Sequence, residues 1–140
     1  MLKPQFKVIP HASDIGIRVQ ASSIKALFEY AAFGMFSLVS PPARIKNPVK
    51  KTINLDATDM ENLLVVWLSE LLYDFHTEKI LFSEFRIKAI TETHVYAEVT
   101  GENLELTPKK LKREIKAVTY HGMKITHANK KWTAEIIFDL

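Results

Sequence analysis

Apolar residues recur at helical spacing in two stretches of the chain. The first runs from Ile24 to Val39, where apolar residues return every three or four positions, as in an amphipathic helix. Ser22 or Ser23 can accept hydrogen bonds from the free backbone N–H groups at its start. Pro41-Pro42 is incompatible with further helix at its end. We therefore predict one helix over this stretch.

The second helix is predicted to begin at Thr58-Asp59-Met60-Glu61, where Thr58 and Glu61 have the spacing of a capping box. Its apolar stripe includes Trp67 and extends to Phe75. Such a stripe indicates core packing rather than a cofactor pocket. The polar residues of this helix, among them Asp74, are expected to point away from the stripe.

Most of the remaining chain alternates apolar and polar residues over short runs, which is the pattern of half-buried strands. We expect strands at residues 6–10, 15–20, 50–56, 85–90, 94–100, 114–120, 123–127 and 131–139. Residues 91–93 and 128–130 are predicted to close hairpins, and Gly101-Glu102-Asn103 to turn the chain out of a strand. Two helices with hairpin-connected strands indicate an α+β fold: a two-layer sandwich in which a largely antiparallel sheet packs against two main helices.

Composition limits the classes of protein that fit. A chain of 140 residues, 47% of them hydrophobic, can form a single domain over residues 1–140 without a structural metal. It contains no cysteine, which excludes disulfides, zinc–thiolate sites and thiol nucleophiles. The longest apolar run, Leu63 to Leu68, is too short to span a bilayer, and no signal peptide is visible. We expect a soluble cytoplasmic protein without membrane association.

Two carboxylates occupy positions that strand formation does not explain. Asp14 lies between two predicted strands near the N-terminus, and Asp139 ends the last predicted strand, although strands disfavour Asp. The two could meet in space and hold a hard cation through oxygen ligands. Asp14 is equally explained as a turn residue. With only two acids, such a site would need water, backbone carbonyl groups or the α-carboxylate of Leu140 to complete it.

The strand predicted at residues 114–120 carries a further polar candidate. Alternation places Lys116 and His121 on opposite faces, so they do not act on one ligand unless the strand bends or ends between them. Gly122 makes a bend at His121 plausible. Lys116 can contact a phosphate or pair with an acid, or it can lie at a sheet edge with its ammonium group in water. His11 and His121 are also explained as turn residues.

The net charge of +3 is unevenly distributed, because one short segment contains Lys109, Lys110, Lys112, Arg113 and Lys116. Such a cluster attracts phosphate, although charge runs are usually solvated surface. One alternative function is therefore a small basic RNA-binding module that uses this segment. That module would bind RNA without another protein, and its affinity would fall steeply with salt.

A second alternative is a metal-dependent hydrolase in which the acid pair activates water. The chain has no glycine-rich phosphate loop, no His-Glu-x-x-His sequence, no nucleophile elbow and no EF-hand loop. A catalytic base is missing and further acids are scarce near both carboxylates, and hydrolysis requires several positioned groups. The sequence therefore disfavours an autonomous enzyme.

Four segments carry a resemblance to a known family. They are His11-Ala12-Ser13-Asp14-Ile15-Gly16, Trp67-Leu68-Ser69-Glu70-Leu71-Leu72-Tyr73, Ile115-Lys116-Ala117-Val118-Thr119-Tyr120-His121 and Ile137-Phe138-Asp139-Leu140. In this order the chain resembles archease, the accessory protein of the GTP-dependent RtcB-type RNA ligase, over essentially its whole length. The family's first motif usually reads His-Thr-Ala-Asp, whereas this chain has Ala12 and Ser13. The hydroxyl has moved by one position, and the acid is kept.

The resemblance implies an activator that is not itself an enzyme. The ligase attaches GMP to its own histidine and joins RNA 2′,3′-cyclic phosphate or 3′-phosphate ends to 5′-hydroxyl ends, as in tRNA splicing. Archease-like proteins promote this guanylylation and the ligase's multiple turnover. The resemblance implies that Asp14 and Asp139 bind a divalent cation and that Lys116, with His11 and His121, serves ligase activation. Hard oxygen ligands favour calcium, with magnesium or manganese as alternatives; the ligase is the expected partner, and RNA is reached through it.

The involvement of Leu140 gives a testable prediction. If its α-carboxylate completes the cation site, a C-terminal tag will weaken calcium binding relative to the untagged protein, because the tag removes that charged ligand. Titration calorimetry of both forms measures the difference. Equal calcium affinities would contradict a role for Leu140.

Overall fold

A computed structural model describes residues 5–10 and 14–140. The helices are α1 (Ile24–Val39) and α2 (Met60–Glu78). The strands are β1 (Phe6–Pro10), β2 (Asp14–Ala21), β3 (Pro48–Asp56), β4 (Ile80–Ile90), β5 (His94–Asn103), β6 (Ala117–Val118), β7 (Lys124–Ala128) and β8 (Lys131–Asp139). Within the described residues, neither helix is long and apolar enough to cross a membrane.

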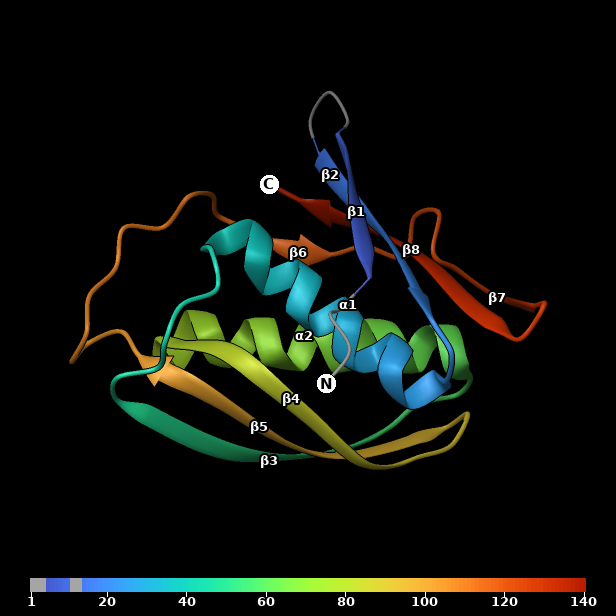
Figure 1. The fold of residues 1–140 in the computed structure, drawn as a ribbon, viewed down its shortest axis with the longest axis horizontal. Coiled ribbons are helices and arrows are strands. Elements are labelled where there is room, and N and C mark those ends of the chain that lie inside the picture. Colours follow the sequence, from blue (N-terminus) through green and yellow to red (C-terminus); the bar gives the residue numbers. More distant parts are fainter. Residues whose placement is uncertain (1–4, 11–13) are drawn as a thin grey trace.

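The strands form two antiparallel sheets with the helices between them (Figure 1). One sheet has the order β1-β2-β8-β6, with β7 also paired to β8, and the other has the order β3-β5-β4. The α+β class, the antiparallel pairing and the two main helices are confirmed. The strands are divided between two sheets rather than gathered in the one sheet we expected, because both helices contact strands on two sides.

Helix α1 shows why two layers of strands are needed. Its buried residues are Leu27, Phe28, Ala31, Ala32, Gly34, Met35, Phe36, Leu38 and Val39, which do not fit on one narrow stripe. A helix that is apolar on most of its circumference must be covered on more than one side. On α2, Trp67 is fully buried, and its indole N–H donates to the carbonyl of Phe28 in α1 at 3.0 Å. Core packing by Trp67 is confirmed.

Both ends of α1 agree with the sequence, whereas the cap of α2 differs. Ser23 caps α1, and Ser40 ends it directly before the two prolines. The predicted capping box of α2 is wrong, because Asp59 rather than Thr58 accepts the hydrogen bond from Asn62 N, at 2.8 Å. Glu61 is thereby released from the cap, and its carboxylate accepts a hydrogen bond from Ile125 N in β7 at 2.9 Å.

Asp74 is a second correction. It was expected to point to solvent, but only 4% of it is exposed. Its carboxylate lies 3.4 Å from the ammonium of Lys51 in β3, which also binds Glu78. Burial raises the pKa of Asp74, while the nearby Lys51 acts in the opposite direction. The second sheet covers this side of α2, which periodicity on the helix alone does not reveal.

Three strands differ from their predicted extents by three residues or more at one end. Strand β4 begins at Ile80 instead of residue 85, and β5 continues to Asn103, so Gly101-Glu102-Asn103 is strand and not a turn. Strand β6 contains only Ala117 and Val118. The turns at 91–93 and 128–130 connect antiparallel neighbours as predicted, and Asn129 and Lys130 adopt positive φ.

Gly101 explains why glycine stands inside β5. A Cβ atom at this position would lie 2.6 Å from Ile80 Cγ2 and 2.7 Å from the carbonyl oxygen of Leu81, and a backbone atom cannot rotate away. We expect Gly101→Ala to lower the free energy of unfolding by about 2 kcal/mol, the usual scale of overpacking. Urea denaturation measures this. A change below about 0.5 kcal/mol, as at ordinary surface positions, would contradict the close approach.

Candidate functional site

The two candidate carboxylates lie directly opposite each other. Asp14 begins β2, Asp139 ends β8, and the antiparallel register pairs them. The next pair, Ile15 and Phe138, is buried against the helices. Because side chains alternate between the faces of a sheet, the two aspartates share the opposite face, which we call the outer face. The predicted meeting of the two acids is therefore present.

This pairing has an electrostatic cost. Directly opposed residues of an antiparallel pair have Cβ atoms about 5 Å apart, and like charges at that separation destabilise the pairing. A cation between Asp14 and Asp139 would offset the repulsion. Within residues 5–10 and 14–140, no group of three or more His, Asp or Glu side chains could hold a metal ion. The pair therefore needs backbone oxygens, water or groups outside the described residues to complete a cation site.

Lys116 lies beside Asp139. Its backbone N–H donates to the carbonyl of Asp139 at 2.8 Å, and the following residue, Ala117, pairs with Asp139 in register. Ile115 is fully buried and anchors the chain on the other side, while Lys116 itself is exposed. The sheet thus brings Asp14, Asp139 and Lys116 to one end of neighbouring strands.

The predicted alternation through residues 114–120 is wrong, because regular pairing covers only two residues there. Beyond Val118, Thr119 donates through both its backbone N–H and its hydroxyl to the carbonyl of Ile137. The bend at His121 is confirmed: Gly122 has φ +69° and lies against Ile137, two residues before Asp139. The strand therefore ends between Lys116 and His121, which meets the condition under which both could serve one site.

The remaining predicted site residues have different outcomes. His121 is exposed in the turn. Leu140 directly follows β8 and is 41% exposed. His11 lies outside the described residues, so its predicted role remains a prediction.

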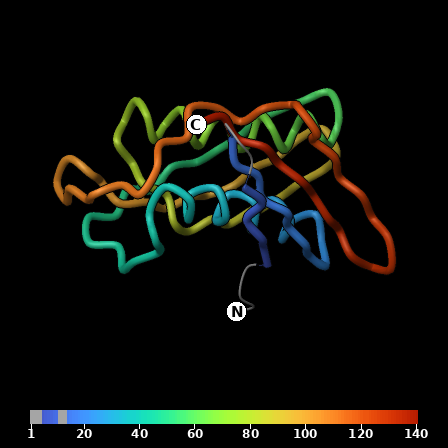
Figure 2. The backbone as a smooth tube through the Cα atoms, turned by 90° about the horizontal axis from the view of Figure 1, so that it is seen from above, coloured from blue at the N-terminus to red at the C-terminus, as the bar shows by residue number. Residues whose placement is uncertain are grey.

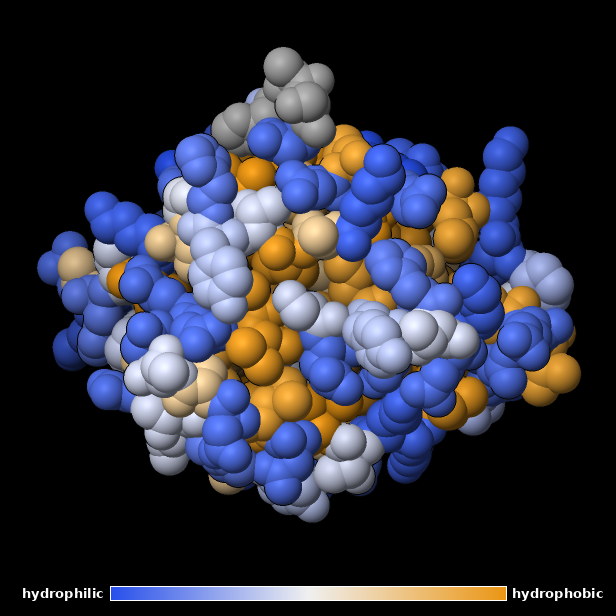
Figure 3. Space-filling model, turned by 180° about the vertical axis from the view of Figure 1, so that it is seen from behind, coloured by the Kyte–Doolittle hydropathy of each residue, from blue (hydrophilic) through white to orange (hydrophobic). Residues whose placement is uncertain are grey.

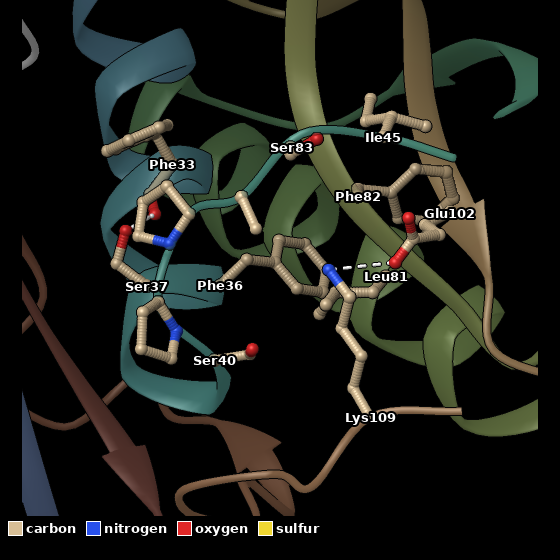
Figure 4. A pocket seen from close by; sticks show the side chains of 13 residues that line it. Phe33, Phe36, Ser37, Ser40, Ile45, Leu81, Phe82, Ser83, Glu102 and Lys109 are labelled. Atoms are coloured by element: carbon tan, nitrogen blue, oxygen red, sulfur yellow. Dashed lines mark hydrogen bonds and ion pairs between the residues drawn. The ribbon is translucent and has the colours of Figure 1, made fainter. Parts of the chain in front are cut away.

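The basic segment is partly used inside the protein. Glu102 in β5 is only 2% exposed; its carboxylate lies 2.8 Å from the ammonium of Lys109 and accepts a hydrogen bond from Lys46 N at 2.7 Å. Figure 4 shows this pair at the side of a small pocket whose other walls include Phe36 and Phe82. The hydrogen bond from Lys109 lowers the pKa of Glu102. Lys109 is therefore an anchor rather than a free phosphate contact.

Two further residues of the segment hold α1. Lys112 N donates to the carbonyl of Val39 at 2.8 Å, and the Arg113 guanidinium donates to the carbonyl of Leu38 at 3.0 Å. These carbonyl groups belong to the last turn of α1, where they have no partner within the helix and where a positive charge is favourable. Of the five cations in the segment, only Lys110, Lys112 and Lys116 have exposed side chains. Because Lys109 and Arg113 are used inside the protein, the structure weakens the case for an RNA site on this segment. Sequence inspection missed Glu102 as the acid that anchors it.

These features define a class: an α+β protein whose two antiparallel sheets enclose two helices and in which two central, neighbouring strands of one sheet, β2 and β8, place two acids at a common end. Residues 6–140 match the archease protein family (MTH1598/TM1083). The chain is 35% identical to protein archease of Methanosarcina barkeri, covering 97% of this chain and 96% of that protein. It is 31% identical to protein archease of Pyrococcus furiosus, covering 97% and 99%.

Solved structures agree. The solution structure of Methanobacterium thermoautotrophicum protein 1598 matches with a TM-score of 0.75 and 29% identity, covering 96% of this chain and 98% of that one. A crystal structure from Thermotoga maritima, described as an archease and possible chaperone, shares the fold with a TM-score of 0.68 at 20% identity, covering 100% and 98%. The chain belongs to the archease family, as the sequence resemblance predicted.

The Glu102–Lys109 pair gives a pH-dependent prediction. We expect Lys109→Met to lower the free energy of unfolding near pH 7 by about 2 kcal/mol, because it leaves a buried carboxylate with one partner fewer. The folded-state pKa of Glu102 lies below its ordinary value of 4.5, so this stabilisation is present above that pH and is lost as the pH falls through the folded-state pKa. The two proteins should therefore converge in stability at acid pH.

Lys110→Met is the matched control, since Lys110 is the exposed neighbour of Lys109. Urea titrations between pH 3 and 7, interpreted by linkage, distinguish the two variants. A loss in Lys109→Met that is independent of pH, or an equal loss in Lys110→Met, would contradict the assignment.

Proposed function

We propose that this archease-family protein is a non-catalytic activator of an RtcB-type, GTP-dependent RNA ligase in the cytoplasm. It would promote guanylylation of the ligase and its multiple turnover in joining RNA 2′,3′-cyclic phosphate or 3′-phosphate ends to 5′-hydroxyl ends, as in tRNA splicing. The observation that carries the proposal is the pairing of Asp14 opposite Asp139, with the backbone of Lys116 bonded to Asp139.

The acid pair suits a divalent cation. Both candidate ligands are carboxylate oxygens, which favour calcium, magnesium or manganese over softer metals. Asp14 and Asp139 would hold the ion, and Leu140, next in the chain, would contribute main-chain oxygen. Once bound, the ion would supply positive charge that stabilises phosphate groups at this end of the sheet. It would also remove the repulsion between the two acids that the pairing register sets opposite each other.

Lys116 and the turn at His121 would complete the functional end. The Lys116 backbone is fixed by Asp139 and by the buried Ile115, while its exposed ammonium can contact a phosphate presented by a partner. His121 lies in the turn that packs on Ile137. These groups supply charge and position rather than a nucleophile, which fits assistance to a reaction that takes place on another protein.

The proposal predicts that Asp14→Asn and Asp139→Asn each reduce stimulation of ligase guanylylation by at least about tenfold, the lower range for damage to a metal site. Asp56→Asn, which alters an exposed strand-end aspartate in the other sheet, should leave stimulation unchanged. Radiolabelled GTP and substoichiometric activator provide the assay.

A second measurement separates loss of function from loss of folding. Without divalent cations, the Asp139→Asn variant should be at least as stable as the parent protein, because the repulsion between the opposed acids is gone. Calcium should raise the melting temperature of the parent but not of the variants. Full stimulation by both variants would overturn the proposed function.

A further inference from the structure

We propose that the outer face of the five-stranded sheet binds the phosphodiester backbone of single-stranded RNA directly. This inference rests on the proposed function, which brings RNA to this protein only through the ligase. It is carried by a row of cations on the same face as Asp14 and Asp139, in a part of the chain that sequence inspection did not single out.

The register defines which residues lie on this face. Lys7 in β1 pairs with Arg18 in β2, Arg18 pairs with Glu135 in β8, and Glu135 pairs with Lys124 in β7. These four positions form one row across four neighbouring strands. On β2 and β8, the pair Arg18–Glu135 lies four residues along the strands from the pair Asp14–Asp139. Gly16–Ile137 is the one outward-facing pair between them. Lys131, further along β8, faces the same way by alternation.

The row has a surplus of positive charge. Glu135 is its one acid, and the Arg18 guanidinium already binds it, with the Nε–H donating at 2.8 Å. Within residues 5–10 and 14–140, none of Lys7, Lys124 and Lys131 forms an ion pair, and all three are exposed. Three uncompensated ammonium groups on one sheet face are an electrostatic site for a polyanion.

The surface between these cations is hollowed and polar. One shallow pocket is lined by Arg18, Gln20, Lys124, Thr126, Thr133 and Glu135, and a neighbouring one shares Arg18 and Gln20 and includes Lys7. Hydroxyl and amide groups of this kind are the usual partners of phosphate and ribose oxygens. The β7–β8 hairpin, which extends beyond the rest of the sheet in Figure 2, lengthens this surface.

The opposite sheet provides a contrast that argues against a general surface effect. On its outer face, Arg86 is paired in register with Glu98, and His94 bonds Asp56 at 2.8 Å. By the same register, Lys124 lies opposite Glu135 on the five-stranded sheet. The contrast is one of number, because the row there has three cations, Lys7, Arg18 and Lys124, and the single acid Glu135.

The same face is a poor site for a protein partner. Protein interfaces have cores rich in aromatic and apolar residues. Among the described residues, none of the exposed large hydrophobic side chains occupies an outward position of β2, β7 or β8. Hydrophobic side chains are visible instead near the centre of the rear face of the molecule (Figure 3). A cationic face with no exposed Phe, Tyr or Trp side chain among the described residues of β1, β2, β7 and β8 fits a phosphodiester chain read without base specificity.

The distance to the acid pair suits an RNA end. Glu135 lies four positions before Asp139 in β8, which is about 13 Å along a strand. A short single strand lying across the cation row could therefore reach Asp14 and Asp139 with its terminus. A divalent cation bound there would neutralise the two aspartates, so that they would no longer repel the phosphates of the strand.

The test measures RNA binding without the ligase. A fluorescein-labelled 15-nucleotide oligouridine with a 3′-phosphate is titrated with the protein, and anisotropy is recorded between 50 and 200 mM KCl. We expect a dissociation constant of about 10–100 µM at the lowest salt, the range of non-specific electrostatic binding. The triple variant Lys7→Gln, Lys124→Gln, Lys131→Gln should bind at least about tenfold more weakly. Its slope of log affinity against log salt should fall by about 2, since each phosphate contact contributes about 0.7.

The matched control removes the same charge elsewhere: Lys88→Gln, Lys110→Gln and Lys112→Gln, all exposed and off this face. Circular dichroism verifies that both triple variants fold. The control should keep at least half of the parent affinity. No measurable affinity in the parent protein, or an equal loss in the control, would overturn the proposal.

A guanylylation assay without RNA separates this inference from the proposed function. The outer-face triple should stimulate guanylylation normally, because that step uses GTP alone. If the triple instead fails to stimulate while still binding RNA, the face contacts the ligase and the RNA proposal is wrong. If the parent protein does not stimulate any ligase but binds RNA through this face, the proposed function fails and the inference stands.

Discussion

The pairing of β2 with β8 is the constraint on which the rest of the site depends. It joins the N-terminal and C-terminal parts of the chain, and its inward residues, including Ile17, Val19, Ile136 and Phe138, are completely buried. A slip of one residue would turn these side chains to solvent, so the core fixes the register. The same register forces Asp14 opposite Asp139. Hydrophobic burial therefore holds together two like charges that would separate if left to electrostatics.

The long connection from β5 to β6 is the second element that shapes the site. It has no regular structure, yet it is fixed by the Glu102–Lys109 ion pair, by Arg113 on the end of α1 and by the buried Ile115. Each anchor satisfies a group that would otherwise be buried or orphaned. Their joint effect is to carry the chain from the three-stranded sheet to Asp139, where Lys116 is placed. A segment that is a run of basic residues in the sequence is thus fixed to the rest of the protein at several points.

The two faces of the five-stranded sheet have separate tasks. The inner face packs on the helices and supplies the stability that keeps the strands in register, whereas the outer face carries charge: the acid pair at one end and the row of Lys7, Arg18 and Lys124 further along. Both groups suit anionic partners once a cation lies between the acids. This arrangement connects the family assignment to phosphate chemistry without requiring this protein to perform that chemistry.

The sequence by itself determined the two helices, the antiparallel pairing, the hairpin turns at 91–93 and 128–130 and the identity of Asp14, Asp139 and Lys116 as candidates, because periodicity, turn residues and residue chemistry are local properties. The tertiary structure alone decided that the strands divide between two sheets, that Asp74 is buried beside Lys51, and that the strand predicted through residues 114–120 is only two residues long. It also decided which lysines form ion pairs: Lys109 finds its acid in a strand, whereas Lys7 and Lys124 form no ion pair with any residue that the structure describes. The physical reason is that burial, register and charge compensation depend on neighbours distant in sequence, which no local pattern specifies.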